Sequence, residues 1–373
     1  MNINESALPG YRRVKQILFQ QITEGGLKPG DRIISERALA ESLGISRLTV
    51  SRAIGELVNE GLLKRRHGSG TYVADWRSRT PTVKTGHIGL VLPHTTDVPS
   101  SELIRGVTTA LRGTGYHTIF ADSGNKLEQE AELLNSLRKD QVDGLIIMPV
   151  DHVADIPIFQ EMTYSGLPFV FVDRFVPNVE CDYVVTDNHW ASFQATKWLI
   201  ERGHQRIAHF TIFNSKSSVV CQRLQGYFDA LTHFGIPHDP DLLCPPSVYE
   251  HRVLAYKHAL SYVRNLPEPA TAVFAMNDTV VWSTLQAVAD LGLRMPEDVE
   301  MAGFFDSGGH VGINASFLKV VQPFFEMGRT AAEILIDAIN NRGEHEIQRK
   351  QLKPSLVASG VPLTVVSDSA VDI

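Results

Sequence analysis

The residues best suited to chemistry lie between Ser46 and Val73, in the stretch SRLTVSRAIGELVNEGLLKRRHGSGTYV. Hydroxyl and guanidinium groups crowd its first turns, and both donate hydrogen bonds to phosphate oxygens and to base edges. A basic run from Lys64 to His67 then leads to the tip Gly68-Ser69-Gly70, where small residues let another molecule approach the backbone closely. This pattern indicates a surface that binds a polyanion.

Charge is divided unevenly along the 373 residues. Residues 1–79 carry 13 lysines and arginines against 8 aspartates and glutamates, whereas the remainder carries 22 against 34. A small basic module is therefore joined to a large acidic one, although the whole chain has a net charge of -7. A basic module is the usual electrostatic signature of a nucleic-acid partner.

Helical periodicity and capping signals organise the basic module. The apolar stripe of its first helix comprises Val14, Ile17, Leu18 and Ile22. Ser35 is placed to cap a short helix in ERALAESLG, Gly44 ends that helix, and Ser46 caps a third one. The inward face of the third helix comprises Val50, Ile54, Leu57 and Val58. Two short helices joined by so tight a turn predict a helix-turn-helix.

The third helix is followed by a pattern typical of a β-hairpin. Leu62 and Leu63 on one side can pair with Tyr72 and Val73 on the other, across the glycine-rich tip. The sequence therefore predicts a winged helix-turn-helix, an α+β arrangement. Because the apolar stripe of the third helix is used for packing, its polar residues face outward into a major groove and its flanking phosphates. These are Ser46, Arg47, Thr49, Ser51 and Arg52. The alternative is a solvated basic face on a protein-interaction domain.

The string KPGDRIISERALAESLGISRLTVSRAIGELVNEGLLKRRHGSGTYV resembles the winged-helix DNA-binding domain of the GntR family. That resemblance implies DNA-contacting positions at Arg37, Arg47, Thr49, His67 and Gly68. Lys64 adds a phosphate contact on the wing. Many members have arginine at the position of Ser51, whereas here it follows at Arg52, so which of the two reads a base stays open. The expected partner is a pseudo-palindromic double-stranded operator, bound by a homodimer.

From His87 onward, short apolar runs alternate with amphipathic helices, and this rhythm implies parallel sheets covered on both faces. Ligands gather at the carboxyl ends of such strands. Several of the predicted strands end there in polar pairs. These are Asp122-Ser123, Asp173-Arg174, Asn277-Asp278 and Asp306-Ser307.

The order of these pieces resembles the effector domain of the LacI/GalR family, which has the fold of periplasmic sugar-binding proteins. The matching segments are VDGLIIMP, FVDR, TDNHWASFQATKWLIERGHQRIAHF, RLQGYFDAL, FAMNDTVV and VVQPFFEMGRTAAEILID. The resemblance implies two α/β lobes joined by three crossovers, near Asp187, Val321 and Lys353. We expect a DNA-binding domain at 1–74, a linker at 75–86, a two-lobed effector and dimerisation domain at 87–367 and a tail at 368–373. GntR heads on LacI bodies are typical of arabinose-repressor-type regulators.

The same resemblance implies effector-binding residues in the cleft. Arg223 occupies the position of an arginine that binds ligand oxygens, and its guanidinium fork suits vicinal hydroxyls or a carboxylate. The other positions are Asp173 and Asn277, with Ser101, Asp122 and Ser123 on the rim of the first lobe. For each of these, a structural cap or turn is the alternative. Phe305 stands where relatives usually have aspartate, so it either stacks on a sugar ring or turns into the core.

The composition and motifs favour a cytoplasmic regulator over other classes. The three cysteines, Cys181, Cys221 and Cys244, lack CxxC spacing and suggest reduced thiols. We expect no cofactor, no metal and no membrane span, and no catalytic string such as GxSxG or HExxH is present in the sequence. The sequence thus predicts a repressor of a carbohydrate-utilisation operon that a sugar-like effector releases from its operator. The alternatives are a non-sugar effector, ligand acting as co-repressor, and a solute-binding protein.

Overall fold

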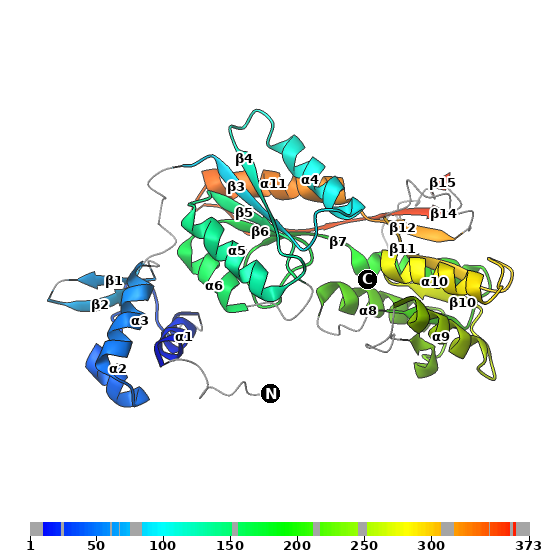
Figure 1. Cartoon of the computed structure of the whole chain (residues 1–373), viewed down its shortest axis with the longest axis horizontal. Coiled ribbons are helices and arrows are strands. Elements are labelled where there is room, and N and C mark those ends of the chain that lie inside the picture. Colours follow the sequence, from blue (N-terminus) through cyan, green and yellow to red (C-terminus); the bar gives the residue numbers. More distant parts are fainter. Residues whose placement is uncertain are drawn as a thin grey trace. The chain divides into compact units, whose positions relative to one another are not determined.

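The computed structural model describes residues 10–23, 26–59, 62–66, 68–74, 84–150, 156–211, 217–244, 252–306, 317–342, 344–358 and 361–362. The chain divides into two compact units. Unit 1 holds the helix-turn-helix and its hairpin within Met1–Lys84, together with Pro157–Pro168 and Asp337–Glu346. Unit 2 holds two large sheets (Figure 1).

The N-terminal elements form a winged helix. They are α1 (Gly10–Thr23), α2 (Glu36–Leu43), α3 (Arg47–Asn59), β1 (Leu63–Arg66) and β2 (Gly70–Val73). The predicted caps are confirmed. The Ser35 Oγ atom accepts a hydrogen bond from Ala38 N at 3.2 Å, and Gly44 ends α2 with a φ of 65°. The Ser46 Oγ atom accepts one from Thr49 N at 3.1 Å, which fixes where α3 begins.

One hydrophobic cluster holds these helices and the wing together. Val14 and Leu18 from α1 and Ile54 and Leu57 from α3 are all 0% exposed. The hairpin contributes Leu62, Leu63 and Val73 to the same cluster. Leu63 pairs with Val73 and Lys64 with Tyr72 in the antiparallel register, so the predicted wing is confirmed.

Unit 2 contains the two parallel-sheet lobes that the sequence predicts. The first-lobe sheet has the order β13-β7-β6-β5-β3-β4, and every pairing in it is parallel. Its strands are β3 (His87–Leu92), β4 (His117–Asp122), β5 (Gly144–Ile147), β6 (Phe169–Asp173), β7 (Asp182–Thr186) and β13 (Arg349–Leu352). The helices that alternate with these strands along the chain are α4 (Val98–Ala110), α5 (Leu127–Lys139) and α6 (Ile156–Ser165). Helix α11 (Phe324–Asn340) follows β12.

The second-lobe sheet has the order β15-β14-β12-β11-β10-β8-β9. Its strands are β8 (Ile207–Phe210), β9 (Leu243–Cys244), β10 (Ala272–Ala275), β11 (Glu300–Phe304), β12 (Leu318–Val321), β14 (Ser355–Ala358) and β15 (Val361–Pro362). Its helices are α7 (Asn188–Glu201), α8 (Ser218–His233), α9 (Arg252–Arg264) and α10 (Asp278–Asp290), with the short helix η3 (Pro240–Leu242). Two separate hydrophobic clusters, one with α7 and α8 and the other with α9 and α10, cover its two faces.

The chain passes between the two sheets three times, at the predicted places. It leaves β7 for α7 at Asp187, leaves β12 for α11 at Gln322-Pro323, and leaves β13 for β14 at Lys353-Pro354. All three crossovers lie where strands end, and the carboxyl ends of strands are the region in which open α/β sheets bind ligands.

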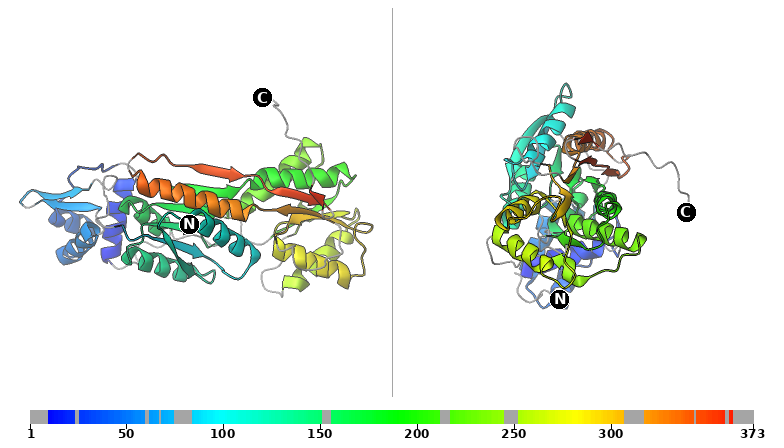
Figure 2. Two further views of the ribbon diagram at one scale, coloured as in Figure 1. Left: turned by 90° about the horizontal axis from the view of Figure 1, so that it is seen from above. Right: turned by 90° about the vertical axis from the view of Figure 1, so that its right-hand side faces the viewer.

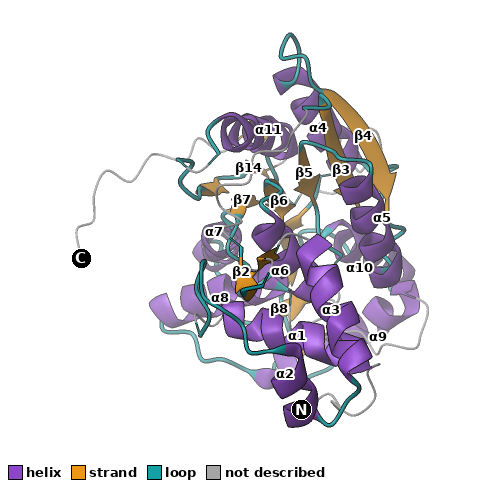
Figure 3. Ribbon diagram, turned by 90° about the vertical axis from the view of Figure 1, so that its left-hand side faces the viewer, coloured by secondary structure: helices purple, strands orange, loops and turns teal. Residues whose placement is uncertain are grey.

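Helices α4 and α11 lie side by side (Figures 2 and 3). Their contact depends on two glycines. A Cβ atom on Gly106 would collide with the Phe325 carbonyl oxygen, and one on Gly328 would collide with the Leu103 carbonyl oxygen. The backbones therefore touch directly, which fixes α11 immediately after the central crossover. Among the described helices, none is long and apolar enough to cross a membrane.

Candidate functional site

The first turn of α3 presents its polar groups at the position that reads bases in a helix-turn-helix. Arg47 is exposed, with 75% of its side-chain surface open. The hydroxyls of Ser46 and Thr49 lie 2.7 Å apart and are part of the helix cap. Ser46 is exposed and Thr49 is half-buried, so the cap lies at the surface of the helix.

A carboxylate that the sequence analysis did not single out lies beneath this surface. Glu36, in the first turn of α2, accepts hydrogen bonds from Arg65 Nη2 at 3.1 Å and from Ser51 Oγ at 3.4 Å. Its second oxygen lies 3.8 Å from Arg47 Nε. One side chain thus orients groups from the recognition helix and the wing at once. The sequence did offer one signal for Glu36, because it is an acidic residue inside a basic segment.

Two more of the predicted arginines are exposed, and each is paired with a glutamate one helical turn away on its own helix. Arg37 Nε lies 3.0 Å from Glu41 Oε1, and Arg52 Nε lies 3.3 Å from Glu56 Oε1. Arg52 also stacks over the ring of Tyr11 at 4.6 Å. Such exposed pairs contribute little to stability, so a phosphate can replace the glutamate as partner.

The wing carries the remaining predicted contacts. Lys64 is exposed on β1, and Gly68 is exposed with a φ of 70°, a conformation that favours glycine. Tyr72 braces the turn, because its hydroxyl lies 2.7 Å from Ser69 Oγ and its ring lies under Arg66 at 4.7 Å. His67, the other predicted wing contact, lies outside the described residues.

In unit 2, Arg223 is the centre of a polar network at the ends of the strands. The residue is 3% exposed. It donates from Nε to Asn188 Oδ1 at 2.8 Å, from Nη1 to the Met276 carbonyl at 2.6 Å and from Nη2 to Gln322 Oε1 at 2.9 Å. The guanidinium also lies over the Phe304 ring at 3.4 Å. Burial lowers the pKa of Arg223 to about 10, so it remains charged at neutral pH.

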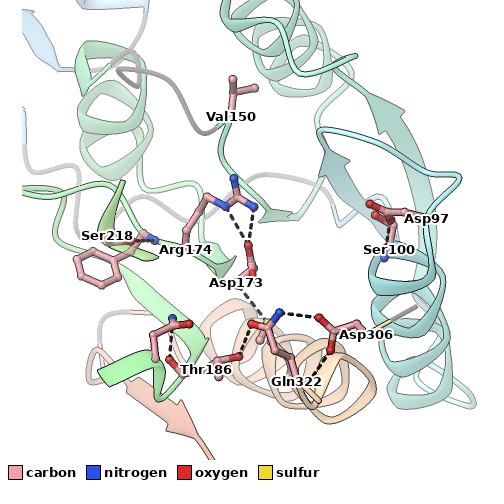
Figure 4. Close-up of polar contacts among 12 residues, drawn as sticks. Asp97, Ser100, Val150, Asp173, Arg174, Thr186, Ser218, Asp306 and Gln322 are labelled. Carbon is pink, nitrogen blue, oxygen red and sulfur yellow. Dashed lines mark hydrogen bonds and ion pairs between the residues drawn. The ribbon is translucent and has the colours of Figure 1, made fainter. Parts of the chain in front are cut away.

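Gln322, on the second crossover, joins this network to both lobes, and Figure 4 shows its contacts with Thr186 and Asp306. Its Oε1 atom also accepts a hydrogen bond from Thr186 Oγ1, at the end of β7, at 3.1 Å. Its Nε2 atom donates to Asp306 Oδ2 at 2.8 Å, and its backbone N donates to Asp306 Oδ1 at 2.6 Å. The crossover lies at its predicted place near Val321, whereas Gln322 was not among the predicted functional residues.

Asp306 follows β11, and the pKa of its carboxyl group is raised. Burial, and then repulsion from Asp278, raise the pKa of Asp306 to about 7. The hydrogen bonds from Gln322 and the charge of Arg223 oppose the shift. The Asp306 backbone N donates to Asp278 Oδ1 at 3.0 Å, which holds the two carboxylates near each other. The charge of Asp306 therefore changes near neutral pH.

The predicted rim residues make local contacts. Ser101 Oγ donates to the Val98 carbonyl at 2.8 Å, and Ser123 Oγ is buried and donates to the Leu92 carbonyl at 3.3 Å. Asp122 is exposed and accepts hydrogen bonds from Thr95 Oγ1 at 2.9 Å and from Gly124 N at 2.8 Å. These contacts are those of turn residues, and within the described chain none of them joins the network around Arg223.

Asp173, Asn277 and Phe305 also have structural partners. Asp173 is buried and forms an ion pair with Arg174, whose Nη2 atom lies 2.7 Å from its Oδ2 atom (Figure 4). Asn277 caps α10 by accepting from Val280 N at 3.0 Å. Phe305 is 1% exposed and packs against Trp282 and Phe317. Of the two orientations open for Phe305, the structure has the one that turns into the core.

A cavity of ≈ 330 Å³ adjoins the network. Asp306 and Gln322 line it together with the first turn of α4 and the first turn of α11. Its other lining residues are Val98, Pro99, Glu102, Val321, Pro323, Phe324, Phe325 and Glu326. None of the predicted effector-binding residues lines this cavity. With the cavity included, the candidate site extends from Asp306 and Gln322 to the first turn of α4. In the described part of the chain, no group of three or more His, Cys, Asp or Glu side chains is arranged to hold a metal ion.

Replacement of Asp306 by asparagine should change the pH dependence of stability. The pKa of the Asp306 carboxyl is about 7 in the folded protein, above its value in the unfolded chain. The protonated carboxyl therefore stabilises the folded state fully at pH values below the unfolded pKa, and this contribution is lost as pH rises through about 7. Between about pH 5 and pH 8, the wild type should lose about 2 to 3 kcal/mol more unfolding free energy than Asp306→Asn. Urea unfolding at both pH values measures this difference.

Asp290→Asn, at the exposed end of α10, is the matched control and should follow the wild type. Equal pH slopes for the wild type and Asp306→Asn would show that the Asp306 carboxylate does not titrate in this range.

Comparison with known proteins agrees with this architecture. Residues 85–355 match the model of periplasmic binding proteins and sugar binding domain of LacI family, and residues 10–73 match that of bacterial regulatory proteins, gntR family. The chain is 29% identical over 359 residues to an arabinose metabolism transcriptional repressor of Geobacillus stearothermophilus, a match that covers 95% of this chain and 98% of that protein.

Two solved structures of regulators are also similar. The transcriptional regulator CelR in its cellobiose complex has 29% identity and a TM-score of 0.64, over 84% of this chain and 90% of that chain. A LacI family regulator from Enterococcus faecium with bound ribose has 28% identity and a TM-score of 0.60, over 74% and 99%. Because one family model spans most of the chain and the other spans its N-terminal head, the protein belongs to the LacI family and is a transcriptional regulator with a gntR-type DNA-binding domain.

Proposed function

We propose that the protein represses a carbohydrate-utilisation operon and leaves its operator when a small sugar-like effector binds between the lobes. The observation that carries this proposal is the network of Arg223, Gln322 and Asp306, which ties the end of β7 in one lobe to α8 and β11 in the other. The relatives named for arabinose metabolism and solved with cellobiose or ribose support a carbohydrate effector.

The chemistry of the network suits a ligand rich in hydroxyl groups. Asp306 and Gln322 offer a carboxylate and an amide to the cavity, and Arg223 brings a buried positive charge behind them. Hydroxyls can both donate to the carboxylate and accept from the amide. Because Phe305 is buried, the site lacks the second carboxylate that sugar-binding relatives usually carry there, and selectivity must come from the remaining groups.

The switch follows from the position of Gln322 on a crossover. A ligand that competes for Asp306 or Gln322 changes the hydrogen bonds that hold the second crossover to Thr186 and Arg223. A ligand shifts such an equilibrium only by its difference in affinity for the two states, so a tenfold change in operator affinity needs about 1.4 kcal/mol of coupling. Tighter operator binding with ligand would instead identify a co-repressor.

A homodimer is part of the proposal. One winged helix spans only a few base pairs, so useful affinity requires two heads, and twofold symmetry then requires a pseudo-palindromic operator. We expect much of the dimer surface to lie on the effector module, including the start of α11 near Glu326. Light scattering at micromolar concentration should give twice the chain mass. A monomer that protects a single half-site in footprinting would contradict this.

The two kinds of DNA contact should respond differently to substitution. Arg47→Ala should cost about 1 to 3 kcal/mol on an operator selected from random DNA and should relax base preference, because a bidentate arginine reads a base edge. Lys64→Ala should weaken all sequences alike and lower the slope of log affinity against log salt by about 1, as expected for a phosphate contact. Fluorescence anisotropy on operator and scrambled DNA measures both. Equal losses for Arg47→Ala on the two DNAs would remove its base-reading role.

Arg223→Lys should leave operator binding intact and abolish the response to effector. Lysine keeps the charge but cannot serve Asn188, Met276 and Gln322 together, so the network that senses the ligand is broken. Operator affinity titrated against a panel that includes arabinose, ribose and cellobiose tests this, and circular dichroism checks that the variant is folded. A folded variant with an unchanged response would place the effector elsewhere.

A further inference from the structure

The recognition helix exposes one large apolar side chain. Leu48, the second residue of α3, is 85% exposed, whereas Val50, Ile54 and Leu57 on the same helix are 0% exposed. At 3.6 residues per turn, Leu48 lies roughly 150° around the helix from the mean direction of that buried stripe. It is therefore on the outer face of α3 and takes no part in the core of the winged helix.

The neighbours of Leu48 are cationic or polar. Arg47 precedes it and has 75% of its side-chain surface exposed, and Arg52, one turn later on the same face, has 67% exposed. Ser46 caps the helix just before it. A partner of this surface must therefore be anionic and must also offer a small apolar group between its charges.

The major groove of DNA meets both requirements. Phosphates flank it, and the only apolar group that a base pair presents there is the C5-methyl of thymine. The first turn of a recognition helix is the part that contacts base edges. Arg47 and Leu48 lie side by side in that turn, so one can donate to a base edge while the other meets a methyl group.

We propose that Leu48 selects a thymine in each operator half-site by packing on its C5-methyl group. This inference rests on the DNA-binding function proposed above and adds a specificity-determining residue to it. Thymine and deoxyuridine pair identically and differ at this position only by the methyl group. The hydrogen-bonding contacts of Arg47 and of the wing should therefore be unaffected by that exchange.

The test begins with selection of the preferred operator from random double-stranded DNA by the full-length protein. Each thymine of the half-site is then replaced by deoxyuridine, symmetrically in both half-sites, and the dissociation constant is measured by fluorescence anisotropy. At one thymine, the wild type should bind about 4-fold more weakly per half-site, which corresponds to about 0.8 kcal/mol for one methyl group at 1.4 kcal/mol per tenfold.

Leu48→Ala should lose the penalty at that thymine, and Leu48→Met, which keeps an apolar side chain of similar length, should retain most of it. Ile347→Ala, at an aliphatic side chain 46% exposed on the other module, is the matched control and should behave like the wild type.

The outcomes separate the two proposals. A deoxyuridine penalty that is absent in the wild type, or the same in Leu48→Ala, overturns the role of Leu48. So does a Leu48→Ala variant that weakens operator and random DNA equally, because that result describes a contact with the sugar-phosphate backbone. Failure of the full-length protein to enrich any sequence would instead contradict the DNA-binding function itself.

Discussion

A guanidinium that is removed from water must have its donors satisfied, and this constraint on Arg223 organises the effector module. Only 3% of the residue is exposed, and an unpaired charge at that depth would be severely destabilising. Its acceptors come from the first turn of α7, from the end of β10 and from the crossover before α11. The ends of three elements of the second lobe are therefore fixed to one another by one side chain.

The winged helix repeats this arrangement with the charges reversed. Glu36 is half-buried at the start of α2 and faces Arg47 from α3 and Arg65 from β1. A carboxylate beneath a basic surface reduces the repulsion among those arginines and limits their rotamers before DNA is bound. The negative charge of Glu36 is itself offset by these two arginines.

The local structure of the DNA-binding head was predictable because short-range chemistry decides it. Ser35, Gly44 and Ser46 act within three or four residues of their own position, and a cap looks the same in any fold. The parallel sheets and crossovers were likewise implied by the order of apolar runs and helices. The orientation of Phe305 was not predictable, because it depends on the space that Trp282 and Phe317 leave in the core. Gln322 was missed because its partners are 16, 99 and 136 residues away.

The energies of the network are of the size that a regulatory switch needs. A hydrogen bond to a charged group contributes about 1.5 to 3 kcal/mol, and a tenfold change in operator affinity corresponds to about 1.4 kcal/mol. The Gln322 amide oxygen is shared by Arg223 and Thr186, so a ligand that rotates this amide breaks bonds to both lobes together. The backbone N of Gln322 is also held by Asp306, and α11 begins two residues later, packed directly on α4. Gln322 therefore lies where an exchange of hydrogen-bond partners would act on both lobes and on the start of a closely packed helix pair.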